Sequence, residues 1–173
     1  MKQHAKGIIP PTIRSATSAD AETVARIYID SWNAGFGALL SRADRTVTPA
    51  LTDRWRHDLD QPVPNRWWVA EYSGTTAGVA GIGPSRNPAN VRLGELDTIA
   101  VDPSHWRTGI GTALMSVAMR HLAADGYNEA IVWTVEGYER GIAFYEAFGW
   151  RRDGSVRDDG RQIRLRHGLT TLK

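Results

Sequence analysis

The sequence predicts one mixed α/β domain, and three observations lead to this fold class. The strand and helix patterns follow the order β-α-α-β-β-β-α-β-α-β-β, without a repeat or a low-complexity tract. A hairpin pattern lies in the middle of the chain, and residues 95–135 predict two parallel strands joined by a helix in a right-handed crossover. The length of 173 residues suits one domain with a substantial core. We assign residues 12–173 to this domain and residues 1–11 to a loose N-terminal leader.

The domain begins with a short strand and an amphipathic helix. Residues 12–17 have a strand pattern, and Thr17 with Asp20 three residues later resembles a capping box that starts a helix. The side chains that follow recur at i, i+3, i+4, i+7 and i+8, which defines one helical face. They are Val24, Ile27, Tyr28, Ser31 and Trp32. Gly35 and Gly37 are expected to end this helix.

The middle of the chain predicts one more helix and then three strands. Residues 49–59 are expected to be helical, although the surrounding segment 38–65 has a weak pattern. Residues 66–72 and 77–83 predict a hairpin around the turn "SGTT". After a loop, residues 94–103 predict a third strand that Pro103 closes.

The last part of the chain predicts two helices, a buried strand and a hairpin. The first helix follows two glycines, keeps one apolar face and ends at Gly126; the face comprises Leu114, Val117, Ala118, His121 and Leu122. Residues 129–135 form a nearly continuous apolar run, as in a strand covered on both faces. Residues 138–148 predict a helix that ends at Gly149, and the arginine-rich tail predicts a hairpin across "RDDG".

Composition excludes several classes of protein. Without cysteine the chain has no disulfide framework and no thiolate chemistry, which suits a cytoplasmic location. No apolar run reaches the roughly 20 residues that span a bilayer, so we expect no membrane partner. The net charge is only +2, and the arginines are interleaved with acids or strand residues. We therefore expect no nucleic-acid partner, because the alternative of an arginine-rich binding tail would need those arginines on one face.

The turn before the long helix is the clearest candidate for a binding site. The first N–H groups of a helix are unpaired and can hold an anion where the backbone is accessible. Gly109 and Gly111 remove side chains at this point, and Arg107 and Thr108 add donors. The turn matches neither the Walker loop nor the dinucleotide fingerprint. A flexible turn with a close helix contact is the alternative interpretation.

Two blocks of sequence resemble the GNAT superfamily of N-acetyltransferases. "LDTIAVDPSHWRTGIGTALM" is similar to the family's cofactor-binding core, whose turn reads Gln/Arg-x-x-Gly-x-Gly/Ala; Trp106 takes the Gln/Arg position, and Arg107 follows it. "YERGIAFYEAFGWRRDG" resembles the element Asn-x-x-Ala-x-x-Phe-Tyr-x-x-x-Gly-Phe, with Tyr138 and Gly141 replacing Asn and Ala. The resemblance implies a mixed, mostly antiparallel sheet, splayed at the cofactor strand and covered by helices on both faces.

The resemblance also implies acetyl-coenzyme A as co-substrate and no metal. Backbone groups of Ile99, Ala100 and Val101 would hold the pantetheine arm as an added strand. The pyrophosphate would lie on the glycine turn, at Arg107, Thr108, Gly109, Ile110, Gly111 and Thr112. Tyr138 and Gly141 occupy two further cofactor positions of the family.

Acetyl transfer to an amine requires a proton acceptor and a donor for the departing thiolate. Glu95 matches the place where several family members have a catalytic glutamate, and Asp97 is the substitute because a two-residue period gives both carboxylates one face. Alternatively, one or both carboxylates only attract a cationic substrate. Tyr145 matches the family tyrosine near the coenzyme sulfur, with packing against the sheet as its alternative role.

The acceptor is expected to be a primary amine of a small molecule or a peptide. Trp32 and Phe36 are candidate pocket residues, together with Tyr28 and the hairpin at residues 67–72. Glu95, Asp97 and Glu71 favour a cationic amine. A non-catalytic acyl-coenzyme A sensor is the alternative function, and the oligomeric state is open between a monomer and a homodimer.

Overall fold

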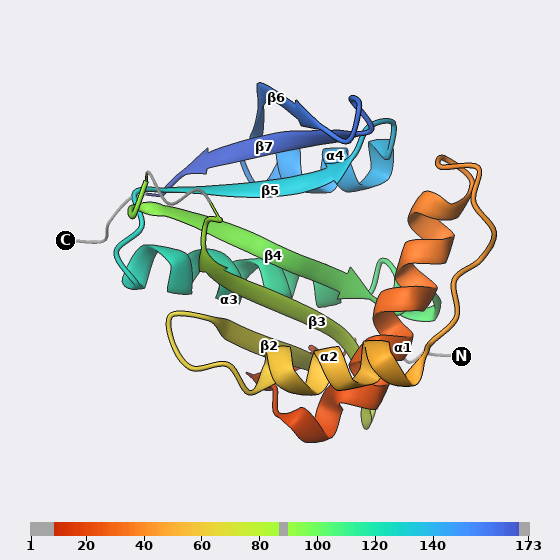
Figure 1. Cartoon of the computed structure of the whole chain (residues 1–173). Coiled ribbons are helices and arrows are strands. Elements are labelled where there is room, and N and C mark those ends of the chain that lie inside the picture. The colour runs from red at the N-terminus through yellow and green to blue at the C-terminus, as the bar shows by residue number, and fades with distance from the viewer. Residues whose placement is uncertain (1–8, 87–89, 170–173) are drawn as a thin grey trace, which may run out of the picture.

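The computed structural model describes residues 9–86 and 90–169, which form a seven-stranded sheet with helices on both faces (Figure 1). The strands are β1 (Thr12–Ser15), β2 (Arg66–Tyr72), β3 (Thr75–Pro84), β4 (Leu93–Val101), β5 (Glu129–Val135), β6 (Arg151–Arg157) and β7 (Gln162–Gly168). The helices are α1 (Ala21–Trp32), α2 (Pro49–Leu59), α3 (Ile110–Ala124) and α4 (Glu139–Ala147). Most of the predicted leader at residues 1–11 lies outside the described residues.

The strand order is β1-β2-β3-β4-β5-β7-β6. β4 and β5 run parallel, as the strand–helix–strand pattern predicts, and the other neighbouring strands of the described sheet are antiparallel. The predicted hairpins around residues 73–76 and 157–160 are both present. The predicted fold class, a mixed and mostly antiparallel sheet, is therefore confirmed.

Two apolar layers hold the helices on the sheet. On one face α1 and α2 pack against β2 and β3 through a cluster that includes Ile27, Trp55 and Val79. On the other face α3 and α4 pack through a larger cluster that includes Leu114 and Ile142. Burial of such side chains is the main favourable term in folding, and it fixes the faces that the helical periodicity predicts.

The ends of the first elements differ slightly from the prediction. β1 ends at Ser15, two residues early, and the predicted capping box is present because the Thr17 N–H donates to Asp20 Oδ2 at 2.9 Å. α1 ends at Trp32 and continues as a π-helical turn, Asn33–Gly37. Gly35 and Gly37 lie inside that turn, so the end of the helical segment is where the sequence predicts it.

The sheet opens between β4 and β5. These strands pair only over Leu93–Glu95 and residues 129–131, whereas β3 accompanies β4 as far as Val101. Beyond Glu95 the edge of β4 that faces β5 has no strand beside it in the described sheet. The predicted splay is therefore present, and it leaves backbone groups of β4 available to an extended ligand.

A β-bulge in β4 lies at the start of the splay. Ile82 pairs with Leu96 and Gly81 with Thr98, so Asp97 is an extra residue in the strand. The two-residue period does not hold across such a bulge, so the prediction that Glu95 and Asp97 share one face is wrong. Glu95 is buried, at 7% exposed, whereas Asp97 is exposed.

Candidate functional site

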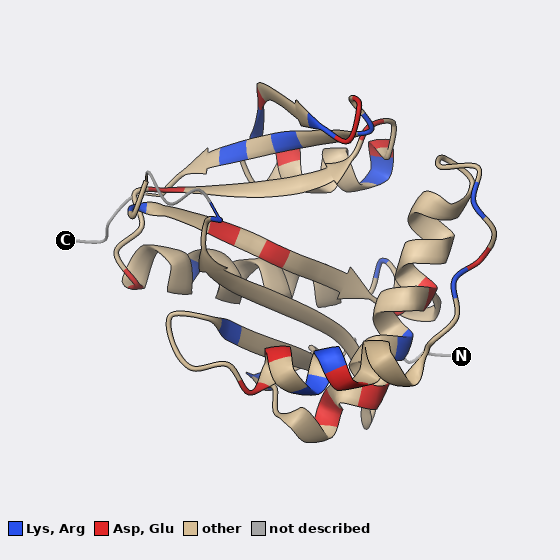
Figure 2. Ribbon diagram, in the orientation of Figure 1, with Lys and Arg blue, Asp and Glu red and all other residues tan. Residues whose placement is uncertain are grey.

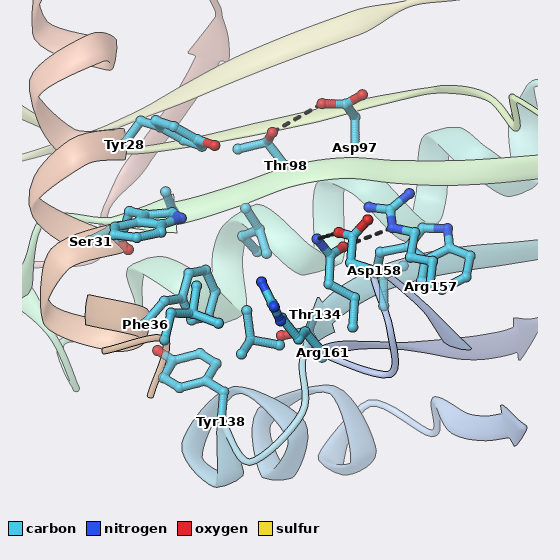
Figure 3. A pocket seen from close by; sticks show the side chains of 18 of the residues that line it. Tyr28, Ser31, Phe36, Asp97, Thr98, Thr134, Tyr138, Arg157, Asp158 and Arg161 are labelled. Atoms are coloured by element: carbon cyan, nitrogen blue, oxygen red, sulfur yellow. Dashed lines mark hydrogen bonds between the residues drawn. The ribbon is translucent and has the colours of Figure 1, made fainter. Parts of the chain in front are cut away.

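Two cavities meet at the splay. The larger has a volume of about 640 Å³ and lies between α1, β4, β5 and the β6–β7 turn (Figure 3). The smaller, of about 240 Å³, lies beside the start of α3 and α4. Their linings share Ser31, Ile99, Tyr138 and Tyr145. A ligand in the smaller cavity can therefore reach a second ligand in the larger one at these four residues.

The glycine turn forms one end of the smaller cavity. Gly109 precedes the first residue of α3 with φ +87°, a left-handed conformation that favours glycine, and a Cβ there would meet no protein atom within 4 Å. No side chain of the described residues caps the start of α3, and its first turn has no acidic residue. Unpaired N–H groups and the helix dipole make this end suitable for an anionic group.

An arginine from α4 completes the smaller cavity. The Trp106 indole N–H donates to the Val101 carbonyl at 2.8 Å, which holds the ring across the turn. The Arg140 guanidinium lies over this ring, 3.5 Å from its centroid, and lines the cavity. Arg140 is not distinguished by the sequence, because its only signal is a position two residues after Tyr138 in the second family block.

The predicted cofactor residues divide into those that line the smaller cavity and those that shape it. The first group comprises Ile99, Val101, Arg107, Gly109, Gly111, Thr112, Tyr138 and Gly141. Ala100 lines the larger cavity instead. Thr108 lines neither cavity, and its hydroxyl donates to the His105 carbonyl at 2.6 Å within the turn. Ile110 is 1% exposed and belongs to the core, so its side chain anchors α3.

Tyr138 and Gly141, the two residues that differ from the second family element, pack against each other. A Cβ at Gly141 would overlap the Tyr138 ring, so the large ring requires the glycine. The same ring lies against Gly35 and edge-on to Phe36, with 4.9 Å between the ring centroids. Tyr138 thus joins α4 to the π-helical turn after α1 and forms part of the wall between the two cavities.

Tyr145 lies where the cavities meet, as a proton donor to a ligand there must. It is 8% exposed, and its ring packs against Phe144 and Trp150. Its hydroxyl has no hydrogen-bond partner among the described residues. Burial, and to a smaller extent the neighbouring Tyr138, raises the pKa of Tyr145 above its usual value of 10.0, so the phenol stays protonated at neutral pH.

The two candidate carboxylates have different surroundings. Burial raises the pKa of Glu95. The Arg86 N–H donates to Glu95 Oε2 at 3.4 Å, and this hydrogen bond offsets part of the increase. Repulsion from Asp97 adds to the increase as a minor cause. Asp97 lines the larger cavity, whereas Glu95 does not, and Asp97 Oδ2 is 2.6 Å from the Arg86 guanidinium. Glu95, whose pKa is raised, therefore has no direct access to the cavity, and Asp97, which has that access, is engaged by Arg86.

The aromatic residues predicted for the acceptor pocket are only partly in place. Tyr28, Trp32 and Phe36 line the larger cavity, and Figure 3 shows Tyr28 and Phe36 pointing into it. The hairpin at residues 67–72 lines neither cavity, so that part of the prediction is wrong. Its Trp67 packs edge-on against Trp55 of α2, and Glu71 is paired with Arg14 at 2.7 Å.

Metal and membrane features are not found in the part of the chain that the structure describes. Residues 9–86 and 90–169 contain no group of three His, Asp or Glu side chains arranged to hold a metal ion. No helix within these ranges is long and apolar enough to cross a membrane.

Comparison with known proteins gives consistent matches. Residues 23–150 match the model of the acetyltransferase (GNAT) family. Phosphinothricin N-acetyltransferase of Streptomyces viridochromogenes is 29% identical over 158 residues, which cover 87% of this chain and 80% of that protein.

Solved structures share the fold at low sequence identity. PaiA N-acetyltransferase from Thermoplasma acidophilum, in complex with coenzyme A, superposes with a TM-score of 0.77 at 15% identity, over 92% of this chain and 99% of that one. YncA from Salmonella typhimurium, solved with acetyl-coenzyme A, gives a TM-score of 0.73 at 22% identity, over 95% of this chain and 97% of that one.

Proposed function

Because the chain belongs to the acetyltransferase (GNAT) family and is an acyltransferase, we propose that it moves an acetyl group from acetyl-coenzyme A to a primary amine. The observation that carries this proposal is the junction of the two cavities at Tyr145. One cavity offers a place for the coenzyme, and the other a place for the acceptor.

The smaller cavity fits the coenzyme in two respects. The free edge of β4 offers the backbone of Ile99 and Ala100 to a pantetheine arm, as a strand would. The Val101 carbonyl already accepts from Trp106, so we assign it a smaller part. The turn at Gly109 and Gly111 leaves the first amides of α3 open to the pyrophosphate. The relatives solved with coenzyme A or acetyl-coenzyme A support this assignment.

Transfer is proposed to occur by direct attack in a ternary complex. The free amine nitrogen forms a bond to the thioester carbon, and the carbon–sulfur bond breaks. The Tyr145 hydroxyl donates its proton to the departing thiolate, which leaves as the thiol. The nitrogen that has attacked loses its second proton as the amide forms, and this proton restores the Tyr145 hydroxyl. No covalent enzyme intermediate is needed, in agreement with a chain that contains no cysteine.

We assign the proton acceptor to Glu95, acting through water. Its raised pKa makes it a better acceptor near neutral pH than an ordinary carboxylate. The carboxylate lies off the cavity lining, so at least one water must carry the proton from the ammonium group. Asp97 lines the cavity but is paired with Arg86, and we assign it the orientation of the amine.

Replacing Gly109 with alanine is expected to weaken acetyl-coenzyme A binding by about tenfold or more. The added methyl group enters the smaller cavity beside the amides that would hold the pyrophosphate. The measurement is the thermal shift caused by acetyl-coenzyme A, which stabilises only the state that binds it.

Gly126→Ala is the matched control for this variant. Gly126 has φ +89°, and its Cβ would also meet no atom within 4 Å, but it lies at the far end of α3. Both variants should lose about 1 to 2 kcal/mol of stability from left-handed strain. If acetyl-coenzyme A gave equal thermal shifts in the two variants, the glycine turn would not be part of the coenzyme site.

Arg140→Ala is expected to weaken coenzyme binding by about tenfold, because a hydrogen bond to a charged group contributes about 1.5 kcal/mol or more. The loss should shrink at high salt, since the guanidinium is exposed. Titration of coenzyme A at two salt concentrations measures both effects. Arg120→Ala removes the same charge from the exposed side of α3 and should bind normally. If the Arg140 variant bound coenzyme A with unchanged affinity, the only role left for this arginine would be its stacking on Trp106.

A further inference from the structure

The larger cavity carries arginines that form no ion pair with a carboxylate of the described residues. Arg45 and Arg161 both line it, and neither guanidinium has a hydrogen-bond or ion-pair partner among the described residues. They come from the segment after α1 and from the β6–β7 turn, which are distant in the sequence. Figure 3 shows Arg161 pointing into the cavity toward Phe36. Unpaired cations that converge on one cavity are suited to an anionic ligand group.

Arg45 is held in place by the π-helical turn. Asn33 binds its backbone twice, since Asn33 Nδ2 donates to the Arg45 carbonyl at 2.9 Å and the Arg45 N–H donates to Asn33 Oδ1 at 2.8 Å. The guanidinium lies over the Trp32 ring, 4.0 Å from its centroid. These contacts fix the side chain and leave its N–H groups free for oxygen atoms of a ligand.

The β6–β7 turn positions Arg161 in a similar way. The Arg161 N–H donates to the Asp158 carbonyl at 3.1 Å, and its own carbonyl accepts from the Glu136 N–H at 2.9 Å. Asp158 and Asp159 also line the cavity, but Gln162 Nε2 donates to Asp158 Oδ2 at 2.6 Å. That hydrogen bond directs the Asp158 carboxylate to Gln162 rather than to Arg161.

Charge is distributed unequally across the splay. β4 carries the two acidic residues Glu95 and Asp97, whereas arginines lie on the strands beyond the opening (Figure 2). On β7, Arg164 and Arg166 are paired with Asp153 and Glu129, so the unpaired positive charge on the cavity side includes that of Arg45 and Arg161. An acceptor that spans the cavity would have its amine near β4 and the thioester, and its other end near Arg45 and Arg161. A second cationic group at that end would be repelled.

We propose that the acceptor is an amine that also carries an oxyanion, a carboxylate or a phosphonate, bound by Arg45 and Arg161. This inference rests on the proposed function and narrows the expected cationic amine to a zwitterionic one. Arg42 and Arg157 line the same cavity, whose four arginines outnumber its three aspartates, Asp97, Asp158 and Asp159.

The test compares acceptors that differ only in the anionic group. The wild-type protein is given acetyl-coenzyme A with β-alanine, L-glutamate or 2-aminoethylphosphonate, and in parallel with β-alaninamide, ethanolamine or 1,3-diaminopropane. Acetylation is measured by mass spectrometry of the amines. We expect kcat/KM to be about 10- to 100-fold higher for the acids, the effect of one or two charge-assisted hydrogen bonds. The carboxylate of β-alanine makes its amine more basic than that of β-alaninamide, so a smaller fraction is free amine at neutral pH, and this difference works against the expected preference for the acid.

Variants separate binding of the anion from a general loss of activity. Arg161→Ala and Arg45→Ala should raise KM for the acids by about tenfold or more, with little change in kcat, and should leave the amides unaffected. Arg161→Lys should restore part of the effect, because it keeps the charge and loses the planar fork. Arg120→Ala is the control for net charge.

Two results would overturn the inference. One is acetylation of the amides or the diamine without acetylation of any acid, and the other is an equal loss for acids and amides in the arginine variants. Either result leaves acetyl transfer itself intact. Failure to release thiol with every amine tested would instead contradict the proposed function.

Discussion

Replacing Tyr145 with phenylalanine is expected to lower kcat by about 10- to 1000-fold while the affinity for acetyl-coenzyme A is kept. The substitution removes only the hydroxyl at the junction of the two cavities. The ring contacts with Phe144 and Trp150 persist, and the lost hydroxyl has no protein partner among the described residues, so the fold should be unaffected. The lower limit applies if a water molecule can protonate the thiolate instead.

Single-turnover thiol release is the measurement for Tyr145→Phe, because product release can hide a slower chemical step. Tyr127→Phe is the matched control, since Tyr127 is also a buried tyrosine in the same core and lines neither cavity. Turnover should fall only in the Tyr145 variant. An undiminished rate in that variant would restrict Tyr145 to packing against the sheet.

Replacing Glu95 with glutamine is expected to lower the rate at neutral pH by about 100-fold, the contribution typical of a general base. At alkaline pH the free amine is already abundant, so the rate should recover in part. Coenzyme affinity should not change, since Glu95 does not line the smaller cavity. A pH profile of kcat/KM for the acceptor measures this recovery.

Asp97→Asn tests the alternative carboxylate. We expect it to raise KM for the amine, with a loss that is similar at all pH values, because Asp97 is assigned to orientation. Alkaline recovery in Asp97→Asn alone would transfer the role of base to Asp97. A loss in Glu95→Gln that is equal at all pH values would mean that Glu95 positions the substrate.

The same Glu95 variant should also change stability with pH. Burial raises the pKa of Glu95 in the folded state above its usual value of 4.5, so folding disfavours the ionised carboxylate. The wild-type protein loses stability from this group as pH rises from 4.5 through the folded-state pKa. Glu95→Gln should therefore have a higher Tm than wild type at neutral pH, and the gain should vanish below about pH 4.5. A variant without this gain would show that the carboxylate is well solvated.

Local signals predict most of the fold. α2 and β5 have the bounds expected from the sequence, since apolar periodicity and the flanking breakers define both elements. The bulge at Asp97 could not be predicted, because an extra residue in a strand leaves no mark on composition. Because Asp97 is the extra residue, Glu95 and Asp97 have different surroundings. A strand with regular alternation would have put both side chains on the same face.

Candidate site residues that lie close together in the sequence were easier to predict than those that only folding brings together. The glycine turn lies within a few residues of its helix, and the family resemblance makes Tyr145 a candidate proton donor. The stacking of Arg140 on Trp106 and the approach of Arg45 and Arg161 to one cavity join segments that are distant in the chain. Lone arginines in a sequence are usually solvated surface residues, so nothing in the sequence distinguished these.

Acetyl transfer itself is tested most directly by measuring free thiol and N-acetylated amine in the same incubation of the wild-type protein with acetyl-coenzyme A and the amine panel. The proposed mechanism predicts equal amounts of the two products, formed at a rate that rises with amine concentration and saturates. Coenzyme binding without either product would instead indicate an acyl-coenzyme A sensor. Thiol release without acetylated amine would indicate hydrolysis, and either outcome would contradict an N-acetyltransferase.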